Sequence, residues 1–236
     1  MSLAQVIRPE HLQRSTKHTS PCGRFELEVE SYQVLEPRGW PYSRLIVRRG
    51  TQEVCSIDRN FSFRGGFFQR GGETWFWTGR HYQSQVFVNC ETGAHCEYQG
   101  APITGSTFCW AGAEPSRSGA LLAVDGCVWA APYELRFFDL SAPEHGWPEL
   151  PLRGVDEPLE TEQAEWEWQG DTFYYREYSL WNTHLDKAQN ELTGDEHIEW
   201  CKRDSDADLI EVDERKLWLE RRDDCMVAIK QWTRPE

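Results

Sequence analysis

Residues 72–77 read Gly-Glu-Thr-Trp-Phe-Trp, and residues 170–175 read Gly-Asp-Thr-Phe-Tyr-Tyr. Both segments begin with a glycine, an acidic residue and a threonine, and both continue into three aromatic residues. Gly23 and Gly119 also precede apolar runs, so four glycine-led segments follow one another at steps of 49, 47 and 51 residues. A repeat of this length indicates a fold assembled from similar structural units.

Each repeat unit also contains a tyrosine after its glycine-led segment. Tyr42, Tyr82, Tyr133 and Tyr178 each open a further strand-like segment, and a turn with a short fourth strand comes after it. Four short strands in about 47 to 50 residues is the length of one β-propeller blade. The sequence therefore predicts an all-β protein of the β-propeller class. A β-sandwich or barrel is the alternative, because those folds also place short strands at regular spacing.

The number of units depends on how the C-terminal region is interpreted. Residues 209–212, 216–220 and 226–230 read as strands of a degraded fifth unit that lacks an outer strand. Residues 3–7, Leu-Ala-Gln-Val-Ile, would supply that strand and remove the open sheet edge. We therefore predict a single domain, residues 1–236, with five blades closed by an N-terminal strand. The alternative is four blades with a C-terminal insertion.

Two segments resemble parts of WD-repeat-like β-propellers. Residues 20–24, Ser-Pro-Cys-Gly-Arg, and residues 115–124 resemble the Ser-Pro-Asp-Gly turn of such a blade and the strand after it. Residues 133–140 resemble the third strand of a blade, although the Trp-Asp and Gly-His pairs of the family are missing from their usual places. The resemblance implies an intracellular scaffold that binds a protein or peptide partner. It implies no chemistry, because a fold does not determine an activity.

The resemblance also implies where a partner would bind. In such propellers the loops between the second and third strands lie on one face, together with the connections between blades. Tyrosine, tryptophan and arginine are common in binding hot spots. The predicted binding residues are Trp40, Tyr42, Arg80, His81, Tyr82, Trp129, Tyr133, Arg176 and Tyr178. The alternative is that these tyrosines pack against neighbouring blades.

Charge and cysteine content limit the classes of partner and the cellular compartment that the sequence predicts. The net charge is −14, and residues 119–236 hold 28 Asp and Glu against 12 Lys and Arg. This half would repel DNA or RNA, so no nucleic-acid partner is predicted. No apolar run is long enough to span a membrane, and the N-terminal residues lack a signal core. We therefore predict a cytoplasmic protein without a membrane partner, whose eight cysteines are reduced, buried and inert.

One segment resembles the start of a calcium loop. Asp204, Asp206 and Asp208 alternate as such a loop requires, but Leu209 and Arg215 occupy the positions that need glycine and glutamate. A solvated acidic turn is the favoured interpretation of these three aspartates. No cofactor is predicted.

The alternative function is a small hydrolase that acts on a sugar or phosphate at the mouth of a central channel. Residues 165–169, Glu-Trp-Glu-Trp-Gln, alternate, so both glutamates share one face of a strand and both tryptophans share the other. Glu165, Glu167, Asp171 and Glu199 are the candidates for acid and base roles. A hydrolase needs carboxylates that converge in a pocket with raised or split pKa values, whereas a binding module needs a contiguous aromatic patch.

Overall fold

The computed structural model describes residues 3–34, 41–80, 84–99, 108–128, 131–155, 158–162, 164–182, 187–188 and 209–233. The fold is all-β, and its strands form several mostly antiparallel sheets. The chain divides into two compact units, unit 1 with residues 1–151 and unit 2 with residues 152–236. Within the described ranges, no helix has the length and apolar character needed to cross a membrane.

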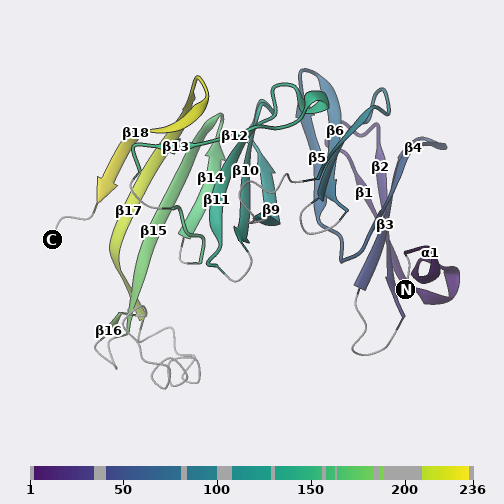
Figure 1. The fold of residues 1–236 in the computed structure, drawn as a ribbon, viewed down its shortest axis with the longest axis horizontal. Helices are drawn as coiled ribbons and strands as arrows, with labels where there is room; N and C mark the ends of the chain where they lie inside the picture. The colour runs from purple at the N-terminus through teal and green to yellow at the C-terminus, as the bar shows by residue number, and fades with distance from the viewer. Residues whose placement is uncertain are drawn as a thin grey trace. The chain divides into compact units, whose positions relative to one another are not determined.

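The described residues of unit 1 form three four-stranded sheets, and in each sheet every strand pairs with the next one along the chain (Figure 1). The first sheet comprises β1 (Leu12–Thr19), β2 (Glu26–Gln33), β3 (Pro41–Arg49) and β4 (Gln52–Arg59). The second comprises β5 (Gly65–Arg70), β6 (Glu73–Gly79), β7 (Ser84–Asn89) and β8 (His95–Gln99). The third comprises β9 (Phe108–Pro115), β10 (Leu121–Val128), β11 (Glu134–Asp139) and β12 (Glu149–Leu150). Short helical turns accompany these sheets at α1 (Leu3–Val6), η1 (Pro9–His11) and η2 (Pro143–His145).

The turns before the second strand of the first and third sheets are built alike. The Gly23 N–H donates to the Ser20 carbonyl at 2.9 Å. The Gly119 N–H donates to the Ser116 carbonyl at the same distance. In each turn the serine hydroxyl also accepts from the backbone N–H five residues later, at 3.1 and 3.3 Å. Both glycines have a positive φ, 74° and 70°, a conformation that a side chain disfavours. The predicted repeat of a glycine turn before a strand is confirmed at these two positions.

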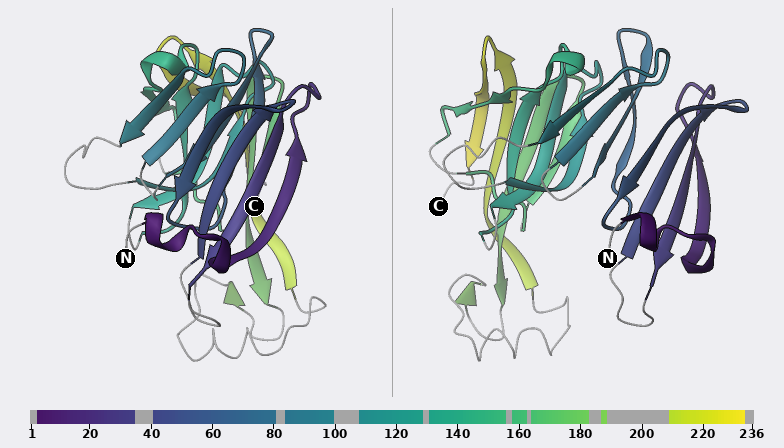
Figure 2. Two further views of the ribbon diagram at one scale, coloured as in Figure 1. Left: turned by 90° about the vertical axis from the view of Figure 1, so that its right-hand side faces the viewer. Right: turned by 45° about the vertical axis from the view of Figure 1, so that its right-hand side comes forward.

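Two hydrophobic layers hold unit 1 together, one on each face of the second sheet. Figure 2 shows the three sheets of unit 1 as ribbons. Strand β7 contributes to both layers, because Val86 and Val88 pack with the first sheet while Phe87 packs with the third. All six residues of β7 are buried. Successive side chains of a strand point to opposite faces, so the apolar run at residues 86–88 packs into both layers.

Unit 2 is built around one sheet with the strand order β13-β18-β17-β15-β14, to which β16 adds by pairing with β15. Its strands are β13 (Leu152–Arg153), β14 (Ala164–Gln169), β15 (Thr172–Asn182), β16 (Lys187–Ala188), β17 (Leu209–Arg222) and β18 (Cys225–Thr233). Strand β13 is parallel to β18, and the other pairs are antiparallel.

The turn predicted at residues 213–215 is wrong, and a separate fifth unit is not confirmed. Residues 209–212 and 216–220 belong to the single strand β17, and residues 213–215 continue that strand where a turn is expected. Strand β17 pairs with β15, so this region completes the fourth sheet. The reason lies in strand pairing: β15 pairs with β17 on both sides of residues 213–215, and a β-bulge accommodates this segment within the sheet. The described residues thus contain four sheets, which is the number of blades in the alternative prediction.

The predicted closing strand at residues 3–7 is also wrong. Residues 3–6 form the helix α1, whose C-terminal Val6 is fully buried. Leu3, Ala4 and Gln5 all have good helix propensity, and Pro9 prevents the α-helix from continuing. The single domain spanning residues 1–236 remains a prediction.

Candidate functional site

Several of the predicted site residues lie outside the described residues. These are the binding candidates Trp40, His81, Tyr82 and Trp129, and the metal candidates Asp204, Asp206 and Asp208. The described binding candidates are Tyr42, Arg80 and Tyr133 in unit 1, and Arg176 and Tyr178 in unit 2. The face that would join all nine residues therefore remains a prediction.

The three candidates in unit 1 lie where the second strand of a sheet connects to the third. Tyr42 is near the start of β3, Arg80 follows β6, and Tyr133 precedes β11. Arg80 forms an ion pair with Glu97 at 3.2 Å. The Tyr133 side chain belongs to the few exposed large apolar groups, with 41% of its surface accessible. The sequence thus placed these residues at the expected ends of their strands.

The two candidates in unit 2 lie inside a strand, where the sequence predicts the start of a new one. Arg176 and Tyr178 both belong to β15. The Arg176 guanidinium carbon lies 4.9 Å from the centre of the Tyr178 ring. Arg176 Nε donates to Glu214 at 2.5 Å and Nη1 donates to Glu165 at 3.1 Å. Hydrogen bonds from Lys216 and Arg176 hold the pKa of Glu214 at about 2, so this carboxylate is ionised at neutral pH.

These residues are part of a larger array, which we call the aromatic face. It consists of Tyr174, Arg176, Tyr178, Lys216, Trp218, Lys230 and Trp232. Tyr174 and Trp218 have ring centres 5.3 Å apart. Lys230 lies 4.3 Å from the Trp218 ring centre, and Lys216 lies 4.7 Å from that of Trp232. Cations over aromatic rings stabilise such an array and hold the rings in place. Trp232 is 39% exposed, so part of the array is accessible.

The opposite side of this sheet is apolar, as the alternation in residues 165–169 predicts. Trp166 and Trp168 both contact Phe173, at ring distances of 5.8 and 5.0 Å. Phe173 and Tyr175 are fully buried. The two glutamates of the alternating segment are exposed on the other face. The prediction that glutamates and tryptophans separate onto two faces is confirmed.

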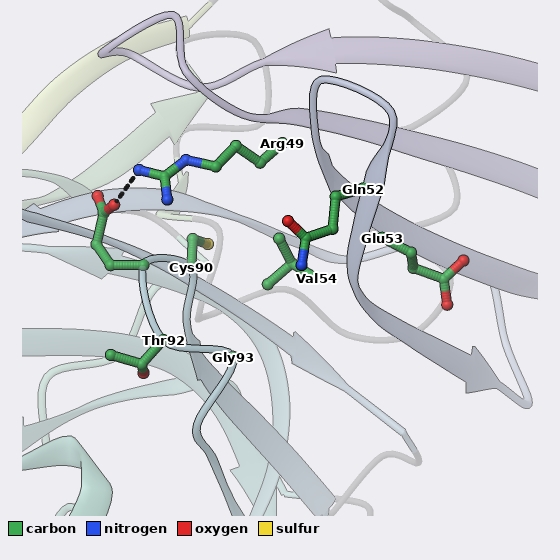
Figure 3. A pocket seen from close by; sticks show the side chains of 8 residues that line it. Arg49, Gln52, Glu53, Val54, Cys90, Thr92 and Gly93 are labelled. Atoms are coloured by element: carbon green, nitrogen blue, oxygen red, sulfur yellow. Dashed lines mark hydrogen bonds and ion pairs between the residues drawn. The ribbon is translucent and has the colours of Figure 1, made fainter.

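A second candidate site lies in unit 1, at the end of the sheets that carries the hairpin turns. It is a hollow of about 120 Å³ lined by Arg49, Gln52, Glu53, Val54, Cys90, Glu91, Thr92 and Gly93 (Figure 3). Glu91 forms ion pairs with Arg49 at 2.9 Å and with Arg24 at 2.5 Å. Cys90 points into the space between Arg49 and Val54, whereas Glu53 points away from Arg49. The Glu91 carboxylate thus pairs with two guanidinium groups beside a small cavity.

Cys22 lies in the turn between β1 and β2, the turn that also carries Arg24, the partner of Glu91. Its Sγ is 3.1 Å from Thr74 Oγ1 and 3.4 Å from Ser20 Oγ. Burial opposes ionisation of this thiol, but hydrogen bonds from Ser20, Thr74 and Arg24 outweigh it and lower the Cys22 pKa to about 6. Cys22 is exposed, which contradicts the expectation that every cysteine is buried and inert. Its place in a Ser-Pro-Cys-Gly turn was the available signal, because such turns lie at the surface.

Two other cysteines of unit 1 differ from Cys22: Cys90 is buried and Cys55 is partly buried. Burial raises the pKa of Cys55 to about 11 and that of Cys90 to about 12. Both thiols are therefore protonated at neutral pH. No group of histidine, cysteine, aspartate or glutamate side chains in the described ranges is arranged to hold a metal ion. The cluster around Cys22 therefore consists of one exposed thiol, the hydroxyl groups of Ser20 and Thr74, and Arg24.

The chain is similar to an uncharacterized protein of Acanthamoeba polyphaga mimivirus, with 36% identity over 160 residues. The matched region covers 66% of this chain and 62% of the viral protein, so the chain spans less than two thirds of that relative's length. No family model matches the chain. The name of the viral protein assigns it no activity.

Proposed function

We propose that the chain is a propeller-type scaffold whose sheets act as four blades, and that its aromatic face binds a protein partner. Three matching four-stranded meanders in unit 1 and the sheet of unit 2 support the blade interpretation. A reducing compartment such as the cytoplasm fits the seven described cysteines, which are free thiols.

The observation that carries the binding proposal is the arrangement of charged and aromatic side chains on one face of the unit 2 sheet. Core-facing positions of a sheet are normally apolar and solvent-facing positions normally small or charged. This face instead presents two tryptophans and two tyrosines, with Lys216 and Lys230 lying over tryptophan rings. Tryptophan, tyrosine and arginine dominate binding energy at protein interfaces. Rings that are already held in place lose little entropy when a partner binds.

The partner segment is basic, because unit 2 as a whole carries an excess of acidic side chains. Unit 2 contains 23 Asp and Glu against 11 Lys and Arg. On the aromatic face, Arg176 and Lys216 are already paired with Glu214. Glu165, which is 61% exposed, and its neighbour Glu167 line the adjacent edge strand β14. An acidic surface attracts a lysine- or arginine-rich segment over long range.

No observation on the described residues favours the hydrolase. Glu165 and Glu167 lie on the open surface of an edge strand, Asp171 is exposed in the turn that follows it, and Glu199 lies outside the described residues. Hydrogen bonds from arginine lower the pKa of Glu28, and hydrogen bonds from lysine and arginine lower that of Glu214. A general acid needs a shift in the opposite direction.

The test uses the full chain and two labelled peptides of equal length, one rich in lysine and arginine and the other rich in aspartate and glutamate. Binding is followed by fluorescence anisotropy at several salt concentrations. One variant carries Glu165→Lys with Glu167→Lys, and the control carries Glu10→Lys with Glu144→Lys at exposed positions of unit 1. Both double variants change the net charge by the same amount.

We expect the basic peptide to bind with an affinity that falls as salt rises. The variant at Glu165 and Glu167 should bind it on the order of tenfold more weakly, equivalent to about 1.4 kcal/mol. The control should bind within about twofold of the wild type, because unit 1 is not part of the proposed surface. Equal losses in both variants would show non-specific attraction, and preference for the acidic peptide would refute the charge assignment.

A further inference from the structure

We propose that the basic segment of the partner binds unit 2 as an added β-strand along the outer edge of β14. This inference rests on the proposed function and specifies how the partner binds. Basic and apolar side chains alternate in the added strand, because neighbouring side chains of a strand lie on opposite faces of the sheet.

Strand β14 lies at the edge of the unit 2 sheet. Among the described strands it pairs only with β15, through six consecutive residues and without a register shift. An edge strand exposes a row of backbone N–H and C=O groups, which is a template for a further strand. Proline, lysine or a β-bulge commonly protects such an edge, and residues 164–169, Ala-Glu-Trp-Glu-Trp-Gln, contain none of them.

The opposite edge of the same sheet is less suited to strand addition. Strand β13 has only two residues there, and they pair with the first part of β18. In the remaining part of β18 the register with β17 shifts between Trp218 and Leu219, and Lys230 lies in this part. A bulge and a lysine both hinder a new strand from pairing. In the described part of unit 2, β14 is therefore the edge with regular geometry.

The two faces of β14 differ in chemistry, and this difference predicts the pattern of the added strand. Glu165 lies opposite Arg176, and the next glutamate, Glu167, lies opposite Tyr174. Residues directly opposite each other in a sheet share a face, so both glutamates lie on the side of the aromatic face. The two tryptophans of β14 lie on the other side and are partly exposed. An added strand thus extends the aromatic face and places every second side chain beside the glutamates.

The charges of this edge select a basic strand. Glu165 is 61% exposed although it pairs with Arg176, and Glu167 is exposed and accepts a hydrogen bond from Gln169 at 2.8 Å. Opposite charges that face one another across two strands stabilise the pairing, and like charges destabilise it. A second copy of β14 would bring glutamates onto the same face as glutamates, so the edge disfavours self-association. A strand with lysine or arginine at every second position meets both carboxylates.

The test uses the full chain and short labelled peptides of equal length. One peptide alternates lysine with valine, a residue that favours strands, and a second has the same composition with all its lysines at one end. A third is the alternating peptide with N-methyl groups on two adjacent central residues, so that one methyl group faces β14 whichever edge the peptide presents. Its control carries the same two groups on the N-terminal residues. Fluorescence anisotropy measures each affinity.

Two further measurements locate the peptide. Hydrogen exchange with mass spectrometry follows the amides of residues 164–169, and those of β1 serve as a comparison edge strand. The variant Glu165→Lys with Glu167→Lys reverses the charge of the edge, and near-ultraviolet circular dichroism verifies that it folds. It is tested with the lysine–valine peptide and with a matching glutamate–valine peptide.

We expect the alternating basic peptide to bind several-fold more tightly than the peptide with its lysines at one end. Central N-methyl groups should weaken binding on the order of tenfold, because they remove backbone hydrogen bonds, and terminal ones should change it by less than about twofold. Bound peptide should slow hydrogen exchange in β14 and not in β1. The charge-reversed variant should prefer the glutamate–valine peptide, a reversal that a loss of structure cannot produce.

The failure of strand addition and the failure of the proposed function give different results. Equal affinity for the two basic peptides, or binding that central N-methyl groups do not weaken, would overturn strand addition and leave the preference for a basic partner intact. Protection of β1 without protection of β14 would overturn the choice of edge. If no basic peptide bound better than the glutamate–valine peptide, the proposed function and this inference would both be overturned.

Discussion

Replacing Gly119 with alanine should destabilise the protein more than replacing Gly23, although the two glycines occupy matching turns. Both have a φ near 70°, and an alanine in this left-handed region costs about 1–2 kcal/mol. The surroundings differ, because a Cβ on Gly23 meets nothing within 4 Å. A Cβ on Gly119 would lie 2.2 Å from the Gln69 carbonyl oxygen and 3.0 Å from Arg70 Cβ. The third sheet must then move away from β5, and overpacking of this kind adds about 1–3 kcal/mol.

The free energy of unfolding of each variant can be measured by urea titration, with tryptophan fluorescence and far-ultraviolet circular dichroism as probes. We expect a loss of about 1–2 kcal/mol for Gly23→Ala and about 2–5 kcal/mol for Gly119→Ala. The difference between the two losses measures the contact between the second and third sheets, since the turn conformation is common to both. Equal losses, or a smaller loss at Gly119, would refute the close approach of that turn to β5.

Two further predictions concern the core of unit 1 and the charged cluster of unit 2. Phe87→Ala should lower the free energy of unfolding by about 3–5 kcal/mol, because its buried ring contacts aromatic side chains in the layer between two sheets. Leu12→Ala, at a side chain that is 40% exposed, should change it by less than about 0.5 kcal/mol in the same urea titration. Glu214→Gln should lower the melting temperature at pH 7, and this deficit should shrink as the pH falls from about 4 towards 2. The lowered pKa of Glu214 stabilises the fold only while the carboxylate is ionised, so a deficit that stayed constant with pH would contradict its pairing with Arg176 and Lys216.

Local chemistry made part of the fold predictable. The glycines at positions 23, 72, 119 and 170 all have a positive φ, and the regular spacing of these residues reveals repeated sheets before any coordinates are known. The same reasoning failed at residues 213–215, where a turn had to be assumed without a glycine. Strand β17 continues through this segment, with a β-bulge between Val212 and Arg215, because its partner β15 is long enough to pair along both halves. Pairing with a distant strand is a property of the tertiary structure.

The candidate sites, too, were predictable where they depend on local sequence and unpredictable where they depend on tertiary structure. The alternation in residues 165–169 predicted which side chains face outward, since a strand has only two faces. The aromatic face could not be predicted, because it depends on the register that places Lys216 opposite Trp232 and Trp218 opposite Lys230.

By itself, the sequence determined an all-β chain of repeated sheets, the turns that start them and the separation of apolar from polar faces, because these follow from backbone conformation and side-chain alternation between near neighbours. Only the tertiary structure decided the number of sheets and the environment of Cys22. Thr74 lies 52 residues away along the chain, and only the packing of two sheets brings its hydroxyl to the thiol.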